Sequence, residues 1–473
     1  MTTATLDRPP AVTAAEPRPS ALAEHYRRQA SSRNVRADLL EVLGWVLMAS
    51  SVALFLADGG AARFTTIAGS FIGVGVIAGL TATMGLLIML LLAARIDFID
   101  KTLGQPRATA LHSKLGDWVV IGLGIHAAFL VTGYALDSGV GILAEFASLW
   151  GSTFDFVLAV LGMVLLLAVV VSSIVAARKR LPYEVWHAIH LLSYAAVAVS
   201  IPHMFSMGGL FAAGTWQRWY WAGALILTGA SLLVYRVLMP LLSSLDHQVR
   251  VSRVVPVGPD TYNIELTGRK LADLDVRAGQ YLHWRFLAPG LWWQQHPFSV
   301  SAAPTDDRLR VTVRKLGKGT TALAAVKPGT LVAVEGPYGT FSDDARTKES
   351  VALIGAGVGI APIRAILEET GIVPGKATVI LRASRPEELY LADEIAQLCH
   401  ARGARLVTLV GHRAPGRWVP ASNPHLQLDH LIPDLAETDV FVCGPAGFTT
   451  AVVDEALALG VPSTQLHDER FDW

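Results

Sequence analysis

Six long apolar segments constrain this chain more than any other feature of its sequence. They lie at roughly residues 38–57, 66–94, 113–135, 153–177, 185–206 and 217–240. Each is long enough to cross the ~30 Å hydrocarbon layer of a membrane as an α-helix. With 52% hydrophobic and only 16% charged residues, the chain is also more apolar than an ordinary soluble protein. We therefore expect a six-helix transmembrane bundle over residues 37–240.

Basic residues in the connections predict how these segments are oriented. They gather before the first segment and in every second connection, as Arg27, Arg28, Arg33, Arg36, Arg95, Lys101, Arg107, Lys114, Arg178, Lys179 and Arg180. Because positively charged loops stay in the cytoplasm, we expect a multi-pass protein of the cell (plasma) membrane with both termini cytoplasmic. Residues 1–36 contain no apolar core of a signal peptide, so a disordered cytoplasmic tail is expected there.

Five histidines lie within or directly at the end of the third and fifth apolar segments, where an ionisable side chain is costly and marks function. His112 and His126 are fourteen residues apart, which on a helix is a rise of ~21 Å with a return to within ~40° of one face. His190 and His203 are thirteen apart and would point ~140° away from each other on a regular helix. Their pairing therefore requires local rewinding, for which Pro202 is the candidate cause.

The third and fifth segments run in the same direction, so His112 can face His190 and His126 can face His203. Imidazole is a suitable ligand for haem iron, and two histidines fill both axial positions, which favours electron transfer. A lone membrane histidine is more often a packing residue, but the paired spacing favours two b-type haems. We interpret His187, three residues off the pattern, as a packing residue.

The pattern changes after Pro240. Alternating β-branched and aromatic residues, as in residues 261–267 and 308–314, predict a small antiparallel β-barrel over residues 247–345. Strands then alternate with helical stretches, which predicts a parallel α/β domain over residues 346–473. Only Cys399 and Cys443 occur, so no secreted type of disulfide framework is expected.

A glycine run formed by Gly355, Gly357 and Gly359 follows an apolar strand and opens a helix, with Pro362 in the first helical turn. Backbone N–H groups at such a helix start can bind a pyrophosphate, and proline costs little there. A glycine run is weak evidence alone, and its spacing departs from the usual G-x-G-x-x-G. It predicts a dinucleotide site only in combination with other motifs.

Several such motifs occur in one order. They are His296-Pro297-Phe298-Ser299, Arg314 with Gly317 and Thr320, Glu335-Gly336-Pro337-Tyr338-Gly339, the run from Gly355 to Pro362, Cys443-Gly444-Pro445, and Glu469-Arg470-Phe471. Together with the paired histidines, this order resembles the ferredoxin-NADP reductase fold as bacterial NADPH oxidases and ferric reductases use it. The resemblance covers about residues 37–473.

The resemblance implies a role for each motif. His296, Pro297, Phe298 and Ser299 would form the flavin-binding strand, with the Ser299 hydroxyl near the reactive edge of FAD. Arg314, Gly317 and Thr320 would hold the FAD phosphates, a task that suits a guanidinium and a hydroxyl, although Arg314 alone fits an exposed strand face better. Cys443, Gly444 and Pro445 would lie beside the nicotinamide, and Phe471 would cover the flavin, with Trp473 as a rival.

Two arginines bear on the choice of nucleotide. Arg385 and Arg413 each follow a predicted strand and can bind a 2′-phosphate, which favours NADPH over NADH. Ordinary surface arginines explain them nearly as well, so NADH stays open.

The combined expectation is electron transfer from cytoplasmic NAD(P)H through FAD and two haems to an acceptor outside, because flavin joins two-electron to one-electron chemistry. Short outer loops favour dioxygen as a small acceptor, giving superoxide, and a ferric chelate is the alternative. A membrane haem-binding sensor or carrier without turnover and a membrane-tethered flavin reductase are the other readings. Besides membrane lipid we expect no obligatory protein partner, and zero net charge gives no support for nucleic acid.

Overall fold

The computed structural model describes residues 21–174, 181, 183–206 and 209–471. The chain forms two compact units, one from Arg36 to Met239 and one that combines the residues up to Val35 with those from Pro240 onward. The described residues include six helices long and apolar enough to cross a membrane, at Ser31–Ala57, Ile67–Ala93, Arg107–Ser138, Phe154–Ser173, Val185–Ser206 and Trp216–His247. The six predicted spans are thereby confirmed.

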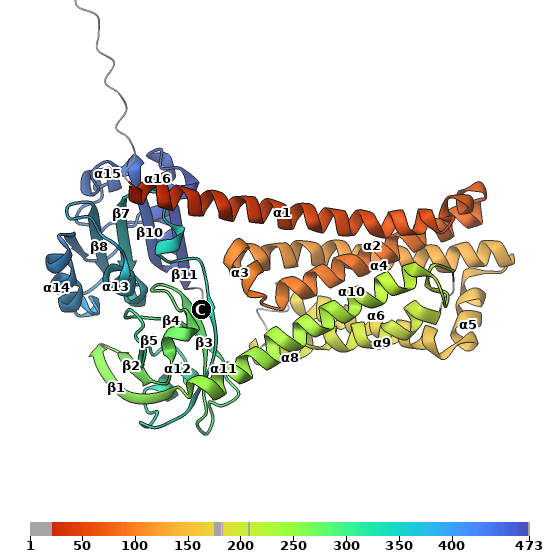
Figure 1. Cartoon of the computed structure of the whole chain (residues 1–473), viewed down its shortest axis with the longest axis horizontal. Helices are drawn as coiled ribbons and strands as arrows, with labels where there is room; N and C mark the ends of the chain where they lie inside the picture. The colour runs from red at the N-terminus through yellow and green to blue at the C-terminus, as the bar shows by residue number, and fades with distance from the viewer. Residues whose placement is uncertain (1–20, 175–180, 182, 207–208, 472–473) are drawn as a thin grey trace, which may run out of the picture. The chain divides into compact units, whose positions relative to one another are not determined.

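Long helices dominate the membrane unit (Figure 1). Its helices include α1 (Ala21–Ala57), α2 (Ile67–Ala93), α3 (Asp97–Leu103), α4 (Gln105–Ser138), α5 (Ile142–Ser152), α6 (Phe154–Ser173), α8 (Tyr183–His190), α9 (Leu192–Ser206) and α10 (Trp216–Leu233), which a π-helical turn (Val234–Leu238) joins to α11 (Met239–His247). The main helix contacts are those of α2 with α4 and of α6 with α9. These two helix pairs carry three of the four predicted haem ligands, and α8 carries the fourth, His190.

The start of α1 corrects one expectation. Residues 21–36 were expected to be disordered, but they are helical in the structure. They contain many good helix formers and neither glycine nor proline, which explains why the helix continues upstream of the apolar segment. The rest of the expected tail, residues 1–20, lies outside the described residues, as do Arg178, Lys179 and Arg180.

The fifth span is interrupted between its two histidines. Helix α8 ends at His190 and α9 begins at Leu192, and the N–H of Tyr194 donates to the carbonyl of Leu191 (3.2 Å). The helical hydrogen bonding is thus interrupted at Leu191. Pro202, the expected site of a distortion, lies inside α9 without ending it.

The first part of the second unit is an antiparallel barrel. Two three-stranded sheets have the orders β1-β2-β5 and β4-β3-β6, and bridges between Val300 and Val311 and between Arg250 and Leu331 connect them. Buried side chains such as Ile264, Leu282 and Trp284 fill the interior. The strands are β1 (Arg250–Gly258), β2 (Thr261–Thr267), β3 (Tyr281–Phe286), β4 (His296–Ser299), β5 (Arg308–Arg314) and β6 (Val332–Tyr338).

The second part is a five-stranded parallel sheet of order β11-β10-β7-β8-β9. Its main elements are β7 (Ser350–Ala356), α13 (Ile360–Glu369), β8 (Ala377–Ala383), α14 (Ala392–Arg402), β9 (Arg405–Val410), α15 (Leu428–Leu431), β10 (Thr438–Pro445), α16 (Ala446–Ala458) and β11 (Leu466–Phe471). Alternate residues of β7 enter two separate cores, one with α13 and α14 and one with α15 and α16. Helices thus cover both faces, and the predicted fold class is confirmed.

Candidate functional sites in the two units

The imidazoles of His112 on α4 and His190 at the end of α8 face each other in the membrane unit. Their ring centroids are 6.2 Å apart. An iron atom held ~2.0 Å from one nitrogen of each ring would separate the centroids by about 6 Å. The pair therefore has the spacing that bis-histidine ligation requires.

Hydrogen bonds orient three of the four rings. The Nδ1–H groups of His112 and His126 donate to the carbonyls of Met89 (3.1 Å) and Gly75 (2.9 Å), both on α2. Nδ1 of His190 lies 3.3 Å from the hydroxyl of Ser173 on α6. A ring whose Nδ1 is engaged in this way presents Nε2 to a metal.

His203 belongs to the predicted second pair. Its ring is 6.3 Å from that of Phe156 on α6. The Nδ1 atom of His203 is buried, and within the described parts of the chain it has no hydrogen-bond partner. The spacing of His112 and His190 thus fits one haem, and the pairing of His126 with His203 stays a prediction.

Other residues of this site were not anticipated. The indole of Trp186 lies 5.2 Å from the His190 ring and donates to Ser173 (3.3 Å). On α2, Gly79 packs directly against the ring of His126. A row of glycines in the second apolar segment was the available signal, because small residues let membrane helices approach closely.

Gly79 allows a direct test of the second pair. A side chain at this position would collide with the His126 ring, so Gly79→Val is expected to displace a ligand and to lower the haem content of the purified protein to about one haem per chain. No described residue lies within 4 Å of the Cβ position of Gly124, which makes Gly124→Val the matched control. Equal haem content in both variants, measured by absorption, would contradict the second site.

In the barrel, β4 brings the four predicted flavin-binding residues to one strand end. Ser299 pairs with Tyr281 of β3, and the rings of His296 and Phe298 stack with centroids 5.6 Å apart. Burial lowers the pKa of His296. Nε2 of His296 and Oγ of Ser299 are buried without a hydrogen-bond partner among the described residues, as expected where a polar ligand would bind.

Glu469, near the end of the parallel sheet, lies next to β4. It belongs to the motif Glu469-Arg470-Phe471, but we had assigned it no role. Its carboxylate lies beside the Ser299 hydroxyl, and its Oε2 is buried without a well-formed hydrogen bond to any described residue. Glu469 on β11 pairs with Cys443 on β10. Burial raises the pKa of the Cys443 thiol well above its usual range, so position rather than thiolate chemistry is what Cys443 contributes.

Glu469 makes stability depend on pH. Burial raises its pKa to about 8, Asp468 adds to this, and Ser299 opposes it. Between about pH 5 and pH 8 the folded protein therefore holds a proton that the unfolded chain has lost, and stability falls as pH rises through this window. Glu469→Gln is expected to flatten this slope in thermal unfolding of the FAD-loaded protein. Asp454→Asn, at an exposed carboxylate of the same domain, is the control, and an unchanged slope in Glu469→Gln would contradict the assignment.

The predicted FAD-phosphate residues lie on the turn after β5. Arg314 is half-buried at the end of the strand, opposite Thr261. The hydroxyl of Thr320 accepts hydrogen bonds from the backbone N–H groups of Leu316 (2.9 Å) and Gly317 (3.1 Å). Thr320 thus shapes the loop, while Arg314 supplies the positive charge.

The glycine run packs against the end of β10. Gly355 pairs with Cys443, Gly357 has a φ of 57° that favours glycine, and the Cβ position of Gly359 overlaps backbone atoms of Cys443 and Gly444. Pro362 is buried in the first turn of α13. The run lies where the strand order reverses between β7 and β10, which is where ligands bind in open α/β sheets.

The last strand brings Phe471 next to the same edge. Phe471 pairs with Pro445 at the ends of β11 and β10 and packs on the core that includes the barrel. Its rival Trp473 lies outside the described residues. The predicted flavin and nicotinamide residues therefore gather around one edge of the sheet.

The two arginines differ in their surroundings. Arg385 is paired with Glu388 (2.8 Å) and Glu387 (3.6 Å). Arg413 is exposed, has no ion pair with another described residue, and its guanidinium lies 3.5 Å from the Cβ position of Gly447 at the start of α16. Of the two, only Arg413 has a guanidinium that carboxylates do not already occupy.

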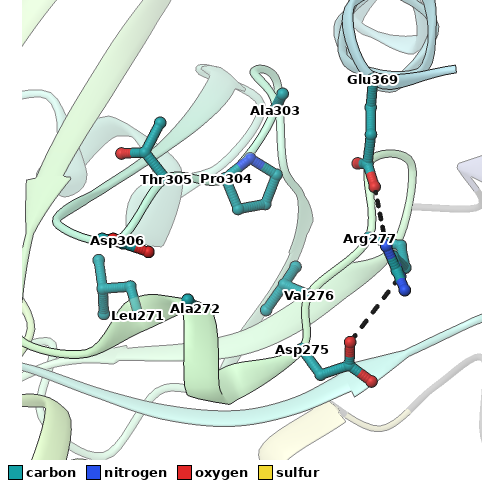
Figure 2. A pocket seen from close by; sticks show the side chains of 10 residues that line it. All are labelled: Leu271, Ala272, Asp275, Val276, Arg277, Ala303, Pro304, Thr305, Asp306 and Glu369. Carbon is teal, nitrogen blue, oxygen red and sulfur yellow. Dashed lines mark ion pairs between the residues drawn. The ribbon is translucent and has the colours of Figure 1, made fainter.

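A cavity of about 250 Å³ lies elsewhere in this unit. Figure 2 shows its lining, with Arg277 between Asp275 (3.8 Å) and Glu369 (3.6 Å). Glu369 also accepts a hydrogen bond from the N–H of Ala278 (2.5 Å). The cavity lies between the barrel and α13, and none of the predicted nucleotide-binding residues lines it.

Comparison with known proteins assigns a domain to each part. Residues 78–201 match the family described as ferric reductase like transmembrane component, residues 247–342 match the FAD-binding domain, and residues 353–454 match the oxidoreductase NAD-binding domain. The three matches follow the order that the motifs predicted.

Curated relatives carry related names. The chain is 30% identical over 225 residues to "Probable metalloreductase AIM14" of Yarrowia lipolytica, covering 46% of this chain and 39% of that protein. It is 27% identical over 256 residues to "Ferric reductase transmembrane component 4" of Saccharomyces cerevisiae, covering 47% and 36%. It is 26% identical over 201 residues to "Flavohemoprotein" of Xylella fastidiosa, covering 41% and 51%. The chain thus spans about half the length of these relatives or less.

The matches and the structure agree on the type of protein. A multi-pass membrane domain precedes a FAD-binding barrel and an NAD-binding α/β domain, as the resemblance implied. The chain therefore combines the domains of a transmembrane NAD(P)H-dependent oxidoreductase, and it is similar to ferric reductases and metalloreductases.

Proposed function

We propose that this protein carries electrons from cytoplasmic NADPH to dioxygen on the outer face of the cell membrane, with superoxide as the product. The observation that carries the proposal is the 6.2 Å separation of the His112 and His190 rings. When bound, the flavin joins hydride transfer to one-electron transfer, and bis-histidine iron passes single electrons. The four histidines would hold two b-type haems for this purpose.

The chain's own residues bind and orient. Ser299 on β4 and Glu469 on β11, which pairs with Cys443 on β10, carry buried polar atoms without a hydrogen-bond partner among the described residues, and these would meet the flavin and the nicotinamide. Phe471 would cover the flavin until the nicotinamide arrives, and its position beside Pro445 supports that role. Arg314 would neutralise FAD phosphates, while the backbone of the glycine run would approach the nucleotide pyrophosphate.

The acceptor is proposed from the outer part of the bundle. Arg218 donates to the carbonyls of Phe205 (3.2 Å) and Phe211 (2.6 Å), and its guanidinium lies over the Phe205 ring. Phe205 follows His203 by two residues on α9. A fixed positive charge here would favour an anion that develops from dioxygen.

A ferric chelate is the second candidate acceptor, and the printed names of two relatives favour it. The deciding experiment is the absorption spectrum of the detergent-purified, FAD-loaded protein before and after anaerobic NADPH. Reduced haem that is reoxidised by air with release of superoxide supports the oxidase. Reduced haem that ignores air but reacts with ferric chelate supports the reductase, and a protein that binds no haem would refute both.

Arg413 is expected to determine the preference for NADPH. Arg413→Ala should lower kcat/KM for NADPH about 10- to 100-fold and leave kcat/KM for NADH nearly unchanged, because a guanidinium binds the 2′-phosphate strongly. Arg385→Ala, the matched control, removes an arginine that is already paired with carboxylates. If Arg385→Ala lost the preference and Arg413→Ala kept it, the two roles would be exchanged.

A further inference from the structure

The residues up to Val35 belong to the same compact unit as the FAD-binding barrel and the NAD-binding domain, which we call the nucleotide-binding unit. Within this unit, the amino-terminal residues of α1 make an unexpected contact. Tyr26 is only 3% exposed. Its hydroxyl donates to Oδ2 of Asp343 (3.1 Å) and accepts from Nη1 of Arg346 (3.1 Å). The Arg346 guanidinium also lies 4.6 Å from the centre of the Tyr26 ring. One side chain thus makes a polar contact and a cation–π contact together.

Several hydrogen bonds hold the Arg346 side chain in place. It is completely buried and donates to Asp343 (3.1 Å), to the carbonyl of Gly371 (3.1 Å) and to the carbonyl of Glu349 (2.5 Å). Burial in this place raises the pKa of Tyr26 to about 12, although Arg346 opposes the shift. Tyr26 therefore stays neutral and can donate its proton to Asp343 over the physiological pH range.

The contact of Tyr26 involves the segment that joins the two nucleotide-binding domains. Asp343, Arg346 and Glu349 lie between the end of the FAD-binding match at residue 342 and the start of the NAD-binding match at residue 353. They form the linker between the two nucleotide-binding domains. The chain passes between its two compact units at only two places, before Arg36 and after Met239, and the first passage comes ten residues after Tyr26.

We propose that Tyr26 docks the amino-terminal segment onto the linker of residues 343–349 and is a positioning residue for electron transfer from the nucleotide-binding unit to the membrane unit. The kinetic part of this inference rests on the proposed function. When the segment is docked, two connections of the chain, before Arg36 and after Met239, tether the nucleotide-binding unit to the membrane unit. When the segment is undocked, only the connection after Met239 remains, and the effective concentration of one unit around the other falls.

The test compares Tyr26→Ala and Tyr26→Phe with Glu24→Ala in the full-length, FAD-loaded protein in detergent. Glu24 is an exposed residue of the same helix and is the matched control. The first readout is hydrogen–deuterium exchange of residues 21–35 and 343–349. The second is anaerobic stopped-flow absorption, which separates flavin reduction by NADPH from the later reduction of haem.

Tyr26→Ala is expected to raise exchange in both segments and to slow haem reduction ~3- to 10-fold while flavin reduction keeps its rate. Tyr26→Phe retains the ring over Arg346 and should have an intermediate effect, which also guards against a folding defect in the alanine variant. Unchanged exchange in the 343–349 segment, or equal slowing of both steps, would overturn the inference. If haem in the unmodified protein is not reduced by NADPH, the proposed function fails, and the exchange result alone decides the docking.

Discussion

Replacing His190 with alanine should remove one haem and lower NADPH-driven superoxide production about 100-fold or more. Loss of a residue that only supports a metal ligand already lowers affinity or activity ~10- to 100-fold, and loss of a ligand itself should cost at least as much. Reduction of FAD by NADPH should keep its rate, since His190 belongs to the membrane unit. The haem content of the purified protein and the anaerobic rate of flavin reduction measure the two effects separately.

His187 supplies the matched control. It lies on the same short helix as His190 but outside the predicted pairing, so His187→Ala should retain both haems. His112→Ala should remove the same haem as His190→Ala, and the double variant should lose no more than either single one, because the two residues serve one iron. Equal loss in the His187 and His190 variants would indicate a structural role for both and contradict ligation.

Substitution of Gly359 should have the largest effect on the nucleotide side. A Cβ at this position would overlap backbone atoms of Cys443 and lie 2.7 Å from the nitrogen of Gly444. Backbone cannot rotate away as a side chain can, so Gly359→Ala is expected to separate the glycine run from the end of β10. We expect flavin reduction by NADPH to fall at least ~100-fold and stability to fall by about 1–3 kcal/mol.

The haem site should be unaffected by this change. Reduction of haem by dithionite, which bypasses the nucleotide site, should remain as in the unmodified protein. Gly371→Ala is the control in the same unit, because none of the residues that the structure describes lies within 4 Å of its Cβ position and its φ is outside the left-handed region. Normal flavin reduction in Gly359→Ala would show that the nicotinamide does not depend on this contact.

Much of the architecture was predictable from local sequence. A membrane span is a property of ~20 consecutive residues, and the period of apolar residues distinguishes the barrel from the α/β domain. The four histidines were predictable for the same reason, since a polar side chain in an apolar segment stands out. The helical stretch from Ala21 was missed because the expectation for it relied on the absence of an apolar run.

Contacts between distant segments were not predictable. The fifth span is interrupted at Leu191, which no proline or glycine marks. Glu469 acquires its raised pKa because the fold buries its carboxylate, although Ser299, far away in sequence, opposes the shift.

The sequence by itself determined the number of membrane spans, the order of the domains and the positions of the candidate histidines and nucleotide motifs, because each follows from residues close together in the chain. Only the tertiary structure decided which backbone carbonyls orient two of the histidines, which of the two arginines pairs with carboxylates among the described residues, and where Tyr26 binds. These features arise when packing brings together groups that are separated in sequence, and burial then changes their hydrogen bonding and their pKa.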